Sequence, residues 1–214
     1  MKLYGGNLSP FVQRVKMQAA VKGIALEMVS PPGGMKSEEY LAINPIGKVP
    51  CLTTDEGLNL PESEVIVEYL EDRFKKPALR GSKPEDKAAA RLISRMADLY
   101  LMAAVGKLFT QFDPATRDQA VIKAALADTA KALGQIEGYM SGKKHAAGPK
   151  FTTADCALTP HLFFVDRMLP MFGVKKPFAA TPKLAKYWKS RAKHDVSAKA
   201  IEEMAEALKQ QFGM

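Results

Sequence analysis

The chain has 214 residues, of which 47% are hydrophobic and 25% charged, an ordinary balance for a folded protein of one or two domains. Its 31 basic and 23 acidic residues give a net charge of +8, but the lysines fall in short pairs without interleaved aromatics, which favours solvated helical faces over a nucleic-acid surface. There is no apolar run of the roughly 18–20 residues that span a bilayer, no secretory signal pattern and no disulfide framework for the two cysteines, so we expect a cytoplasmic protein without membrane partners.

The first residues predict a parallel pair of strands joined by a helix. A strand at Lys2–Tyr4 is followed by a helix from Pro10 to Lys22, which Gly23 ends, and by a second strand at Ala25–Val29. Because a strand, a helix and a strand in this order form a right-handed crossover, the two strands are expected to be parallel.

The next elements predict a hairpin between two helices. A short helix is expected at Ser37–Leu41, and strands at Val49–Thr53 and Leu58–Leu60 flank a turn-rich connector. Ser63 is expected to cap a further helix that extends to Phe74. The pattern is therefore βαβαββα.

The rest of the chain predicts helices only. Lys75 to Pro84 is rich in proline, glycine and lysine and indicates a linker, which gives domains at residues 1–76 and 85–214 and a linker at 77–84. Thr152 and Asp155 form a capping-box pattern, to which we assign a structural role. The expected helices are 88–112, 117–140, 153–171, 181–193 and 197–212.

Two motifs carry the functional information. Asn44 to Pro50 reads Asn-Pro-Ile-Gly-Lys-Val-Pro, and Glu62-Ser63 follows twelve residues later. Proline lacks an N–H for a sheet ladder, so Pro50 suits the start of a strand. Taken alone, spacing favours an ordinary trans Val49–Pro50 bond, since only about 5–6% of X–Pro bonds are cis.

Together with the loop at Gly5–Phe11 and Ser-Pro-Phe-x-x-Arg-Val at Ser9–Val15, these motifs resemble the cytosolic glutathione transferases over nearly the whole chain. The serine points to the serine-type members, tau-like or zeta-like, and particularly to the tau class of plants and related bacterial proteins. The resemblance implies a thioredoxin-like domain followed by an all-helical one, a cis Val49–Pro50 bond, glutathione as cosubstrate without a metal, and a homodimer with Arg73, Arg91 and Asp98 near its interface.

Ser9 is the candidate catalytic residue. Glutathione chemistry needs a thiolate, and a free thiol has a pKa near 8.5. A hydroxyl donor and a helix N-terminus both favour the anion, and Pro10 marks Ser9 as the N-cap. From local sequence alone a simple cap is the favoured explanation of Ser9, and it is the resemblance that assigns it activation of the thiol.

The resemblance also implies where glutathione binds. Lys48 would hold the glycyl carboxylate, the Val49 backbone would pair with the cysteinyl part, and Glu62 and Ser63 would hold the γ-glutamyl end. Lys36 is a weaker candidate because the alignment around it is loose. The full set of expected glutathione-binding residues is Phe11, Lys36, Lys48, Val49, Pro50, Glu62 and Ser63.

An apolar electrophile is expected to bind between the domains, facing Ser9. For each candidate wall residue taken separately, core packing is the stronger alternative. The candidates are Phe11, Tyr100, Met102, Phe109, Phe163, Phe164 and Met168. Tyr4 and Cys51 are expected to be packing residues, and no metal motif is present.

These features predict a glutathione transferase that activates the thiol for attack on an apolar electrophile. One alternative is a dedicated catabolic enzyme, such as an ether-cleaving lyase, a dehalogenase or an isomerase, although the Ser-Ser-Cys signature of the zeta-type isomerases is absent. The other is a binding or regulatory protein of the same fold without useful catalysis.

Overall fold

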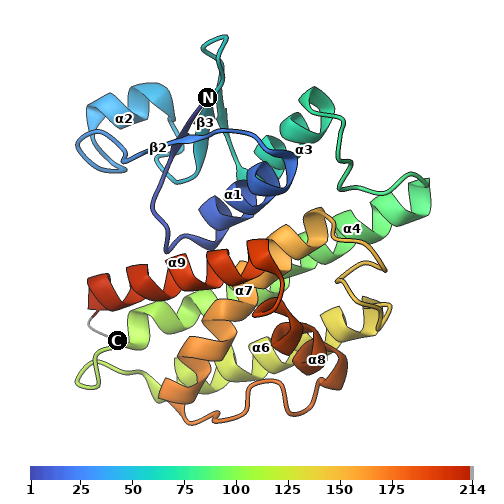
Figure 1. The fold of residues 1–214 in the computed structure, drawn as a ribbon. Helices are drawn as coiled ribbons and strands as arrows, with labels where there is room; N and C mark the ends of the chain where they lie inside the picture. The colour runs from blue at the N-terminus through green and yellow to red at the C-terminus, as the bar shows by residue number, and fades with distance from the viewer. Residues whose placement is uncertain (213–214) are drawn as a thin grey trace. The chain divides into compact units, whose positions relative to one another are not determined.

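The computed structural model describes residues 1–212, which form two compact units. The first contains Met1–Leu79 and the last helix, α9 (Asp195–Phe212), and the second contains Arg80–His194 (Figure 1). Among the described residues, every helix is too short or too polar to cross a bilayer.

A four-stranded sheet forms the centre of the first unit. Its strands are β1 (Lys2–Tyr4), β2 (Glu27–Val29), β3 (Cys51–Thr53) and β4 (Asn59–Pro61), in the order β2-β1-β3-β4. β1 and β2 are parallel, whereas β3 is antiparallel to both β1 and β4. This topology confirms the predicted crossover and hairpin.

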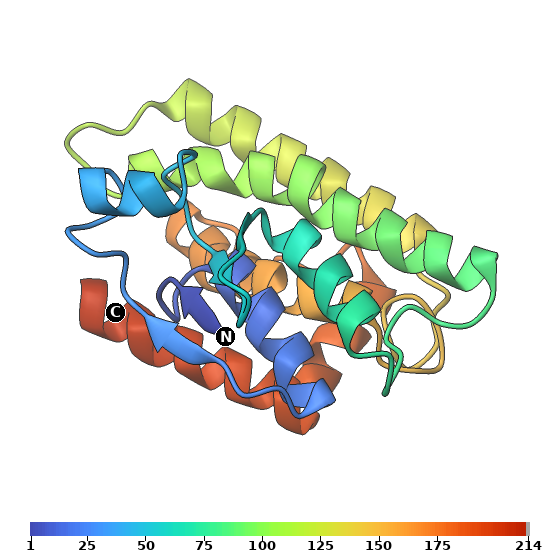
Figure 2. The ribbon, with the colours of Figure 1, turned by 90° about the horizontal axis from the view of Figure 1, so that it is seen from above.

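The strand alternation divides the core of this unit into two faces, because successive side chains point to opposite sides of a sheet. Leu3 and Leu52 pack on the side of α1 (Pro10–Lys22) and α3 (Ser63–Arg73), which lie side by side (Figure 2). The neighbouring Tyr4 and Cys51 pack on the other side against Tyr40 of α2 (Glu38–Ile43). Tyr4 and Cys51 are therefore packing residues, as predicted.

Helix α1 has the predicted bounds. Ser9 is its N-cap, with extended backbone (φ −69°, ψ 122°), and the Ser9 Oγ accepts a hydrogen bond from the Val12 N–H at 3.4 Å. Gly23 ends the helix with φ 68°, a left-handed conformation that glycine adopts without steric cost.

Helix α9 joins the first unit through α1. The Glu203 carboxylate accepts hydrogen bonds from Gln13, at 3.0 Å, and from Lys16, and both donors also reach Asn7 in the loop before Ser9. Burial alone would raise the pKa of Glu203, but the hydrogen bonds from Lys16 and Gln13 and the charges of Lys16 and Lys199 outweigh it, so this pKa is lowered.

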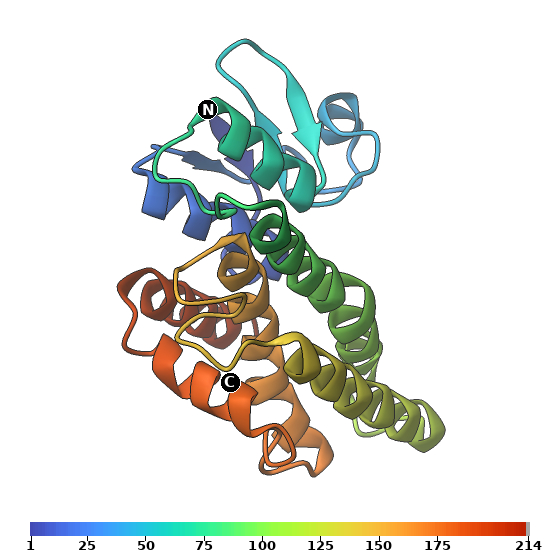
Figure 3. The same ribbon diagram turned by 90° about the vertical axis from the view of Figure 1, so that its right-hand side faces the viewer.

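The second unit contains helices only. Four long ones are α4 (Pro84–Met96), α6 (Gln119–Tyr139), α7 (Thr153–Met168) and α8 (Pro182–Arg191). α4 and α6 lie side by side (Figure 3). α7 is buried on nearly all sides, so it forms the core of this unit. The predicted capping box is present at its start, where the Thr152 N–H donates to Asp155 Oδ2 at 2.9 Å.

The helix predicted at 88–112 is not continuous. After α4 the chain widens into a π-helix, η1 (Ala97–Met102), and continues through α5 (Ala103–Val105) and a 3-10 segment, η2 (Gly106–Gln111). A second 3-10 segment, η3 (Leu169–Phe172), follows α7. In η1 the Asp98 Oδ1 lies 3.4 Å from the buried His161 Nε2 of α7. Periodicity alone does not predict this widening, because each apolar position still fits a helical pattern.

Candidate functional site

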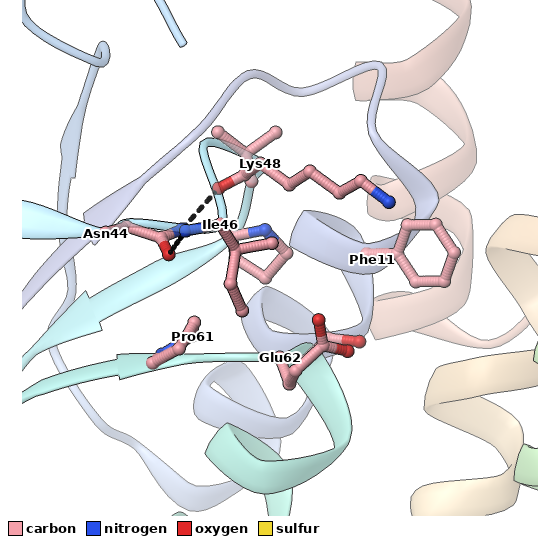
Figure 4. Close-up of a pocket in the computed structure, with 9 residues that line it drawn as sticks. Phe11, Asn44, Ile46, Lys48, Pro61 and Glu62 are labelled. Atoms are coloured by element: carbon pink, nitrogen blue, oxygen red, sulfur yellow. Dashed lines mark hydrogen bonds between the residues drawn. The ribbon is translucent and has the colours of Figure 1, made fainter. Parts of the chain in front are cut away.

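A pocket of about 120 Å³ in the first unit brings together six of the predicted glutathione-binding residues (Figure 4). Its lining consists of Phe11, Asn44, Ile46, Lys48, Val49, Pro50, Pro61, Glu62 and Ser63. Asn44, Ile46 and Pro61 had no predicted role, although the first two belong to the Asn-Pro-Ile-Gly-Lys-Val-Pro motif that pointed to the site. The Lys48 ammonium and the Glu62 carboxylate both extend toward the side where Phe11 lies.

One wall of the pocket is a loop held in place by partly buried hydrogen bonds. The Lys48 carbonyl accepts from the Tyr40 hydroxyl at 2.7 Å and from the Asn44 side-chain amide at 2.8 Å, while Asn44 Oδ1 accepts from the Ile46 N–H at 3.1 Å. The Val49–Pro50 bond is cis, as the resemblance implied. Among the described residues, none hydrogen-bonds to the Val49 backbone, which leaves its N–H and C=O open to a ligand.

Glycine is required within this loop. Gly47 has φ 61°, and a Cβ there would come within 2.9 Å of the Leu41 side chain and of the Met35 carbonyl oxygen. The Asn-Pro-Ile-Gly-Lys pattern thus closes a turn that only glycine fits without strain, directly before Lys48.

The opposite wall is the start of α3, and here one prediction is wrong. Ser63 is the first residue of the helix rather than its cap, and Glu62 occupies the N-cap position without a side-chain cap. Ser63 is not the cap because it is already the first helical residue, and its buried hydroxyl instead accepts a hydrogen bond from Arg14 Nη1 at 3.1 Å. Glu62 has φ 67° and ψ 112°, and among residues 1–212 it is the one non-glycine residue with positive φ.

Arg14 connects α1 to this wall. Its side chain is fully buried, and besides Ser63 it pairs with Glu64 Oε2 at 3.0 Å, so its charge is compensated. It also lies 5.7 Å from the centre of the Phe11 ring. Arg14 therefore fixes the start of α3 and one side of Phe11. Arg14 was identified from the sequence as part of the Ser-Pro-Phe-x-x-Arg-Val motif, but its contact with Ser63 was not predicted.

Two predicted residues lie outside the pocket lining. Ser9 is at the N-terminus of α1, two residues before Phe11, and is partly buried. Lys36 is exposed and its ammonium donates to the Ile46 carbonyl at 3.5 Å, so its observed contact is with the pocket loop.

The predicted electrophile residues of the second unit divide into two groups. Phe163, Phe164 and Met168 are buried in the helical core, where Phe164 contacts the ring of Phe109 edge to face at 5.2 Å. Tyr100, by contrast, is 54% exposed and lines a separate hollow of about 300 Å³ with residues of α6. Met102 and Phe109 are partly exposed.

Cys51 follows the cis proline but is fully buried, and burial raises the pKa of its thiol to about 11. A thiol with this pKa is almost entirely protonated at neutral pH, so Cys51 is a poor nucleophile. In the described part of the chain, no three His, Cys, Asp or Glu side chains are grouped to hold a metal ion.

Comparison with known families gives two consecutive matches. Residues 3–78 match the glutathione S-transferase N-terminal domain and residues 96–195 match the glutathione S-transferase C-terminal domain. The chain is 30% identical over 184 residues to a maleylacetoacetate isomerase of Pseudomonas aeruginosa, covering 81% of this chain and 84% of that protein. It is 32% identical over 173 residues to a probable glutathione S-transferase of Glycine max, covering 80% and 72%. The chain belongs to the glutathione S-transferase family.

Solved structures of this family share the fold. Glutathione transferase F2 of Populus trichocarpa superimposes with a TM-score of 0.81 at 25% identity, over 96% of this chain and 99% of that one. A glutathione S-transferase of Methylobacterium radiotolerans, solved in complex with glutathione sulfonate, gives a TM-score of 0.78 at 24% identity, over 94% and 93% of the two chains. The thioredoxin-like domain and the helical bundle expected from the sequence are therefore confirmed.

Proposed function

We propose that this glutathione transferase binds glutathione in the pocket between Lys48 and Glu62 and activates the thiol through Ser9. The observation that carries the proposal is the convergence, in one small pocket, of an ammonium, a carboxylate, a helix N-terminus and an open backbone amide. Glutathione offers the complementary groups, since it has a carboxylate at each end, one ammonium and a central peptide.

Each part of the tripeptide has a partner in this arrangement. Lys48 pairs with the glycyl carboxylate and Val49 with the cysteinyl peptide. The γ-glutamyl ammonium pairs with Glu62, while its carboxylate receives the N–H groups and the hydroxyl at the start of α3, where the helix dipole favours an anion. Arg14 donates to the Ser63 hydroxyl and so holds it in position.

Ser9 is suited to stabilise the thiolate. Its Oγ accepts the capping hydrogen bond from Val12, and because a hydroxyl has one donor besides its acceptor sites, the O–H is left to donate to sulfur. The sulfur would also lie near the positive end of the α1 dipole. A shift of two pKa units in the bound thiol corresponds to about 2.7 kcal/mol.

The activated sulfur attacks an electrophilic carbon, and either displaces a leaving group or adds to an activated double bond. We propose Tyr100, Met102 and Phe109 as the apolar contacts of the electrophile in the second unit, because these predicted residues retain exposed surface. Phe163, Phe164 and Met168 would act by supporting them from the core.

The deciding experiment measures the pKa of glutathione bound to the protein, from the ultraviolet absorbance of its thiolate as a function of pH. In the parent protein the thiol pKa should lie well below its free value. Ser9→Ala should restore it and lower turnover by about 10–1000-fold, since one lost preorganised donor costs on the order of 1.4–4 kcal/mol. Glutathione affinity should change little.

Ser37→Ala is the matched control, because Ser37 caps α2 in the same way, through a 3.1 Å hydrogen bond from the Tyr40 N–H. It removes an N-cap without removing the proposed donor. An equal loss of turnover in both variants would mean that Ser9 acts only as a cap. Tight binding of glutathione with an unshifted thiol pKa would favour a binding or regulatory protein.

An isomerase is the second candidate, and the relative from Pseudomonas aeruginosa favours it. A panel that contains activated aryl halides, alkyl halides, β-aryl ethers and conjugated cis-dienoic acids separates the possibilities. A general transferase should turn over several of the electrophiles, whereas a dedicated enzyme should be fast on one class and slow on the rest.

We also propose a cytoplasmic homodimer. Both cysteines are buried and free, which suits a reducing compartment. Each unit exposes apolar side chains, Val65 in the first and Leu99 in the second, which a partner subunit would cover. Val65→Glu should shift the mass in sedimentation equilibrium to that of the monomer, and an unchanged dimer would exclude this face.

A further inference from the structure

The positive charge of the chain is concentrated in one segment of the second unit. Residues 141–193 contain eleven of the 31 basic residues and only two of the 23 acidic ones. The remaining 20 basic and 21 acidic residues nearly cancel. The net charge of the protein is therefore a local property of this segment, and the attraction for anions is local too.

Within this segment, four lysines surround one pocket. It has a volume of about 670 Å³, a size typical of small-molecule sites. Lys143 and Lys144 come from the loop after α6, and Lys183 and Lys186 from the first turns of α8. We call this site the lysine pocket. Met140, Pro182 and Tyr187 supply its apolar lining.

The walls of the lysine pocket are fixed by buried contacts. The Lys144 carbonyl accepts from Arg191 at 3.3 Å, and the next peptide is held by Asp155, which accepts from the Ala146 N–H at 3.1 Å. Asp155 also accepts from the Tyr187 hydroxyl at 3.1 Å, which orients the ring that lines the pocket. These contacts hold the loop after α6 beside α8, although the two segments are far apart in the sequence.

One lysine of the pocket is already positioned. The Lys183 ammonium donates to the carbonyls of Glu137 and Met140 at the end of α6, at 3.4 Å and 3.3 Å. An ammonium has three donors, so one remains. The Glu137 carboxylate accepts from the Leu184 N–H at 3.1 Å and so is engaged at the start of α8. Among the described residues, no carboxylate forms an ion pair with any of the four lysines.

We propose that the lysine pocket binds a small molecule that carries a pyrophosphate group. Four lysines that line one hollow supply the positive charge that a compact multivalent anion needs, and single anions such as sulfate would satisfy only part of the set. The apolar lining of Met140, Pro182 and Tyr187 suits a ring or chain attached to the phosphates. The site lies wholly in the second unit and uses none of the residues assigned to glutathione.

Inorganic pyrophosphate is the probe, titrated calorimetrically into the full-length protein at low salt. Lys143→Gln with Lys186→Gln should weaken binding at least about tenfold, because two of the four charges are lost. Both side chains are exposed and free of hydrogen bonds to described residues, so the fold should be unaffected. Glutathione-dependent turnover should stay unchanged and serves as the test of folding.

Lys175→Gln with Lys176→Gln is the matched control, since it removes the same charge from the same basic segment outside the pocket lining. This variant should bind pyrophosphate within about threefold of the parent, because it leaves all four lysines of the pocket in place. Equal weakening in both variants, or no binding by the parent, overturns the proposal. So does a single-stranded RNA that binds more tightly than pyrophosphate and is weakened equally by both variants, because that result assigns the charge to a macromolecular surface.

Discussion

The backbone of Glu62 gives the sharpest test of the site. Its φ of 67° and ψ of 112° fall in a region that residues with a Cβ rarely occupy, at the point where β4 passes into α3. Such strain is retained where the side chain is needed. Replacing Glu62 by glycine should therefore raise stability and lower glutathione affinity at the same time.

The magnitude follows from two opposing terms. Relief of an unfavourable backbone conformation is worth about 1–3 kcal/mol. Glycine also gains freedom in the unfolded chain, which costs about 0.5–1 kcal/mol. The Glu62 side chain is exposed and makes no hydrogen bond to the described residues, so its loss should lower the free energy of unfolding only slightly. The net gain of about 0.5–2 kcal/mol should raise Tm by about 1–8 °C for a chain of this size.

Thermal unfolding and calorimetric titration with glutathione, carried out on the parent, Glu62→Gly and Glu62→Ala, test this prediction. Glu62→Gly should raise Tm, whereas Glu62→Ala keeps a Cβ and should leave it unchanged. Both variants lose the carboxylate, and both should bind glutathione about 10–100-fold more weakly, since a hydrogen bond to a charged group contributes about 1.5–3 kcal/mol. The reasoning fails if alanine stabilises as much as glycine, or if either variant keeps parental affinity.

Three further predictions concern other parts of the first unit. Lys48→Met should raise the KM for glutathione about tenfold or more and leave kcat nearly unchanged, because the substitution removes a binding charge that is remote from the sulfur. A matched fall in kcat would instead place Lys48 in the chemical step. Glu203→Gln should lower Tm at pH 7. Because a carboxylate with a depressed pKa stabilises the fold only while it is ionised, the difference in Tm between the variant and the parent should vanish as the pH falls through the lowered pKa of Glu203. A difference in Tm that stays constant across pH would contradict this. Cys51, with its pKa raised to about 11, should resist alkylation at pH 8 until urea is added, and rapid labelling of the native protein would show an accessible thiolate.

The fold of the first unit was predictable because local signals and tertiary packing agree there. Ser9-Pro10 and Gly23 mark both ends of α1, and both bounds are correct. The second strand starts two residues later than predicted, at Glu27, and is largely exposed. A strand at the edge of a sheet has one neighbour, so its ends are set by pairing with β1 rather than by its own composition.

The site residues were predictable only where they belong to a sequence motif of the family. The resemblance led to Lys48, Val49, Glu62 and Ser63, which do line one pocket. The buried Arg14 that holds Ser63 was beyond sequence reasoning, because its partner is 49 residues away and a lone arginine on a helix carries no sign of burial. The positive φ of Glu62 was not predictable either, because sequence rules expect glycine, asparagine or aspartate at positive φ and give no reason to expect glutamate.

The grouping of the lysines was likewise not predictable from the sequence, because it depends on contacts between distant segments. Along the chain the lysines form short pairs, and each pair taken alone is explained by solvation of a helix or loop. The fold brings the pair at Lys143-Lys144 against Lys183 and Lys186, some 40 residues later, through the buried network of Asp155, which the sequence marked only as a helix cap. Asp155 both starts α7 and holds the loop and the ring that shape the lysine pocket. The capping box, a structural feature by every sequence criterion, therefore determines whether those four charges act singly or together.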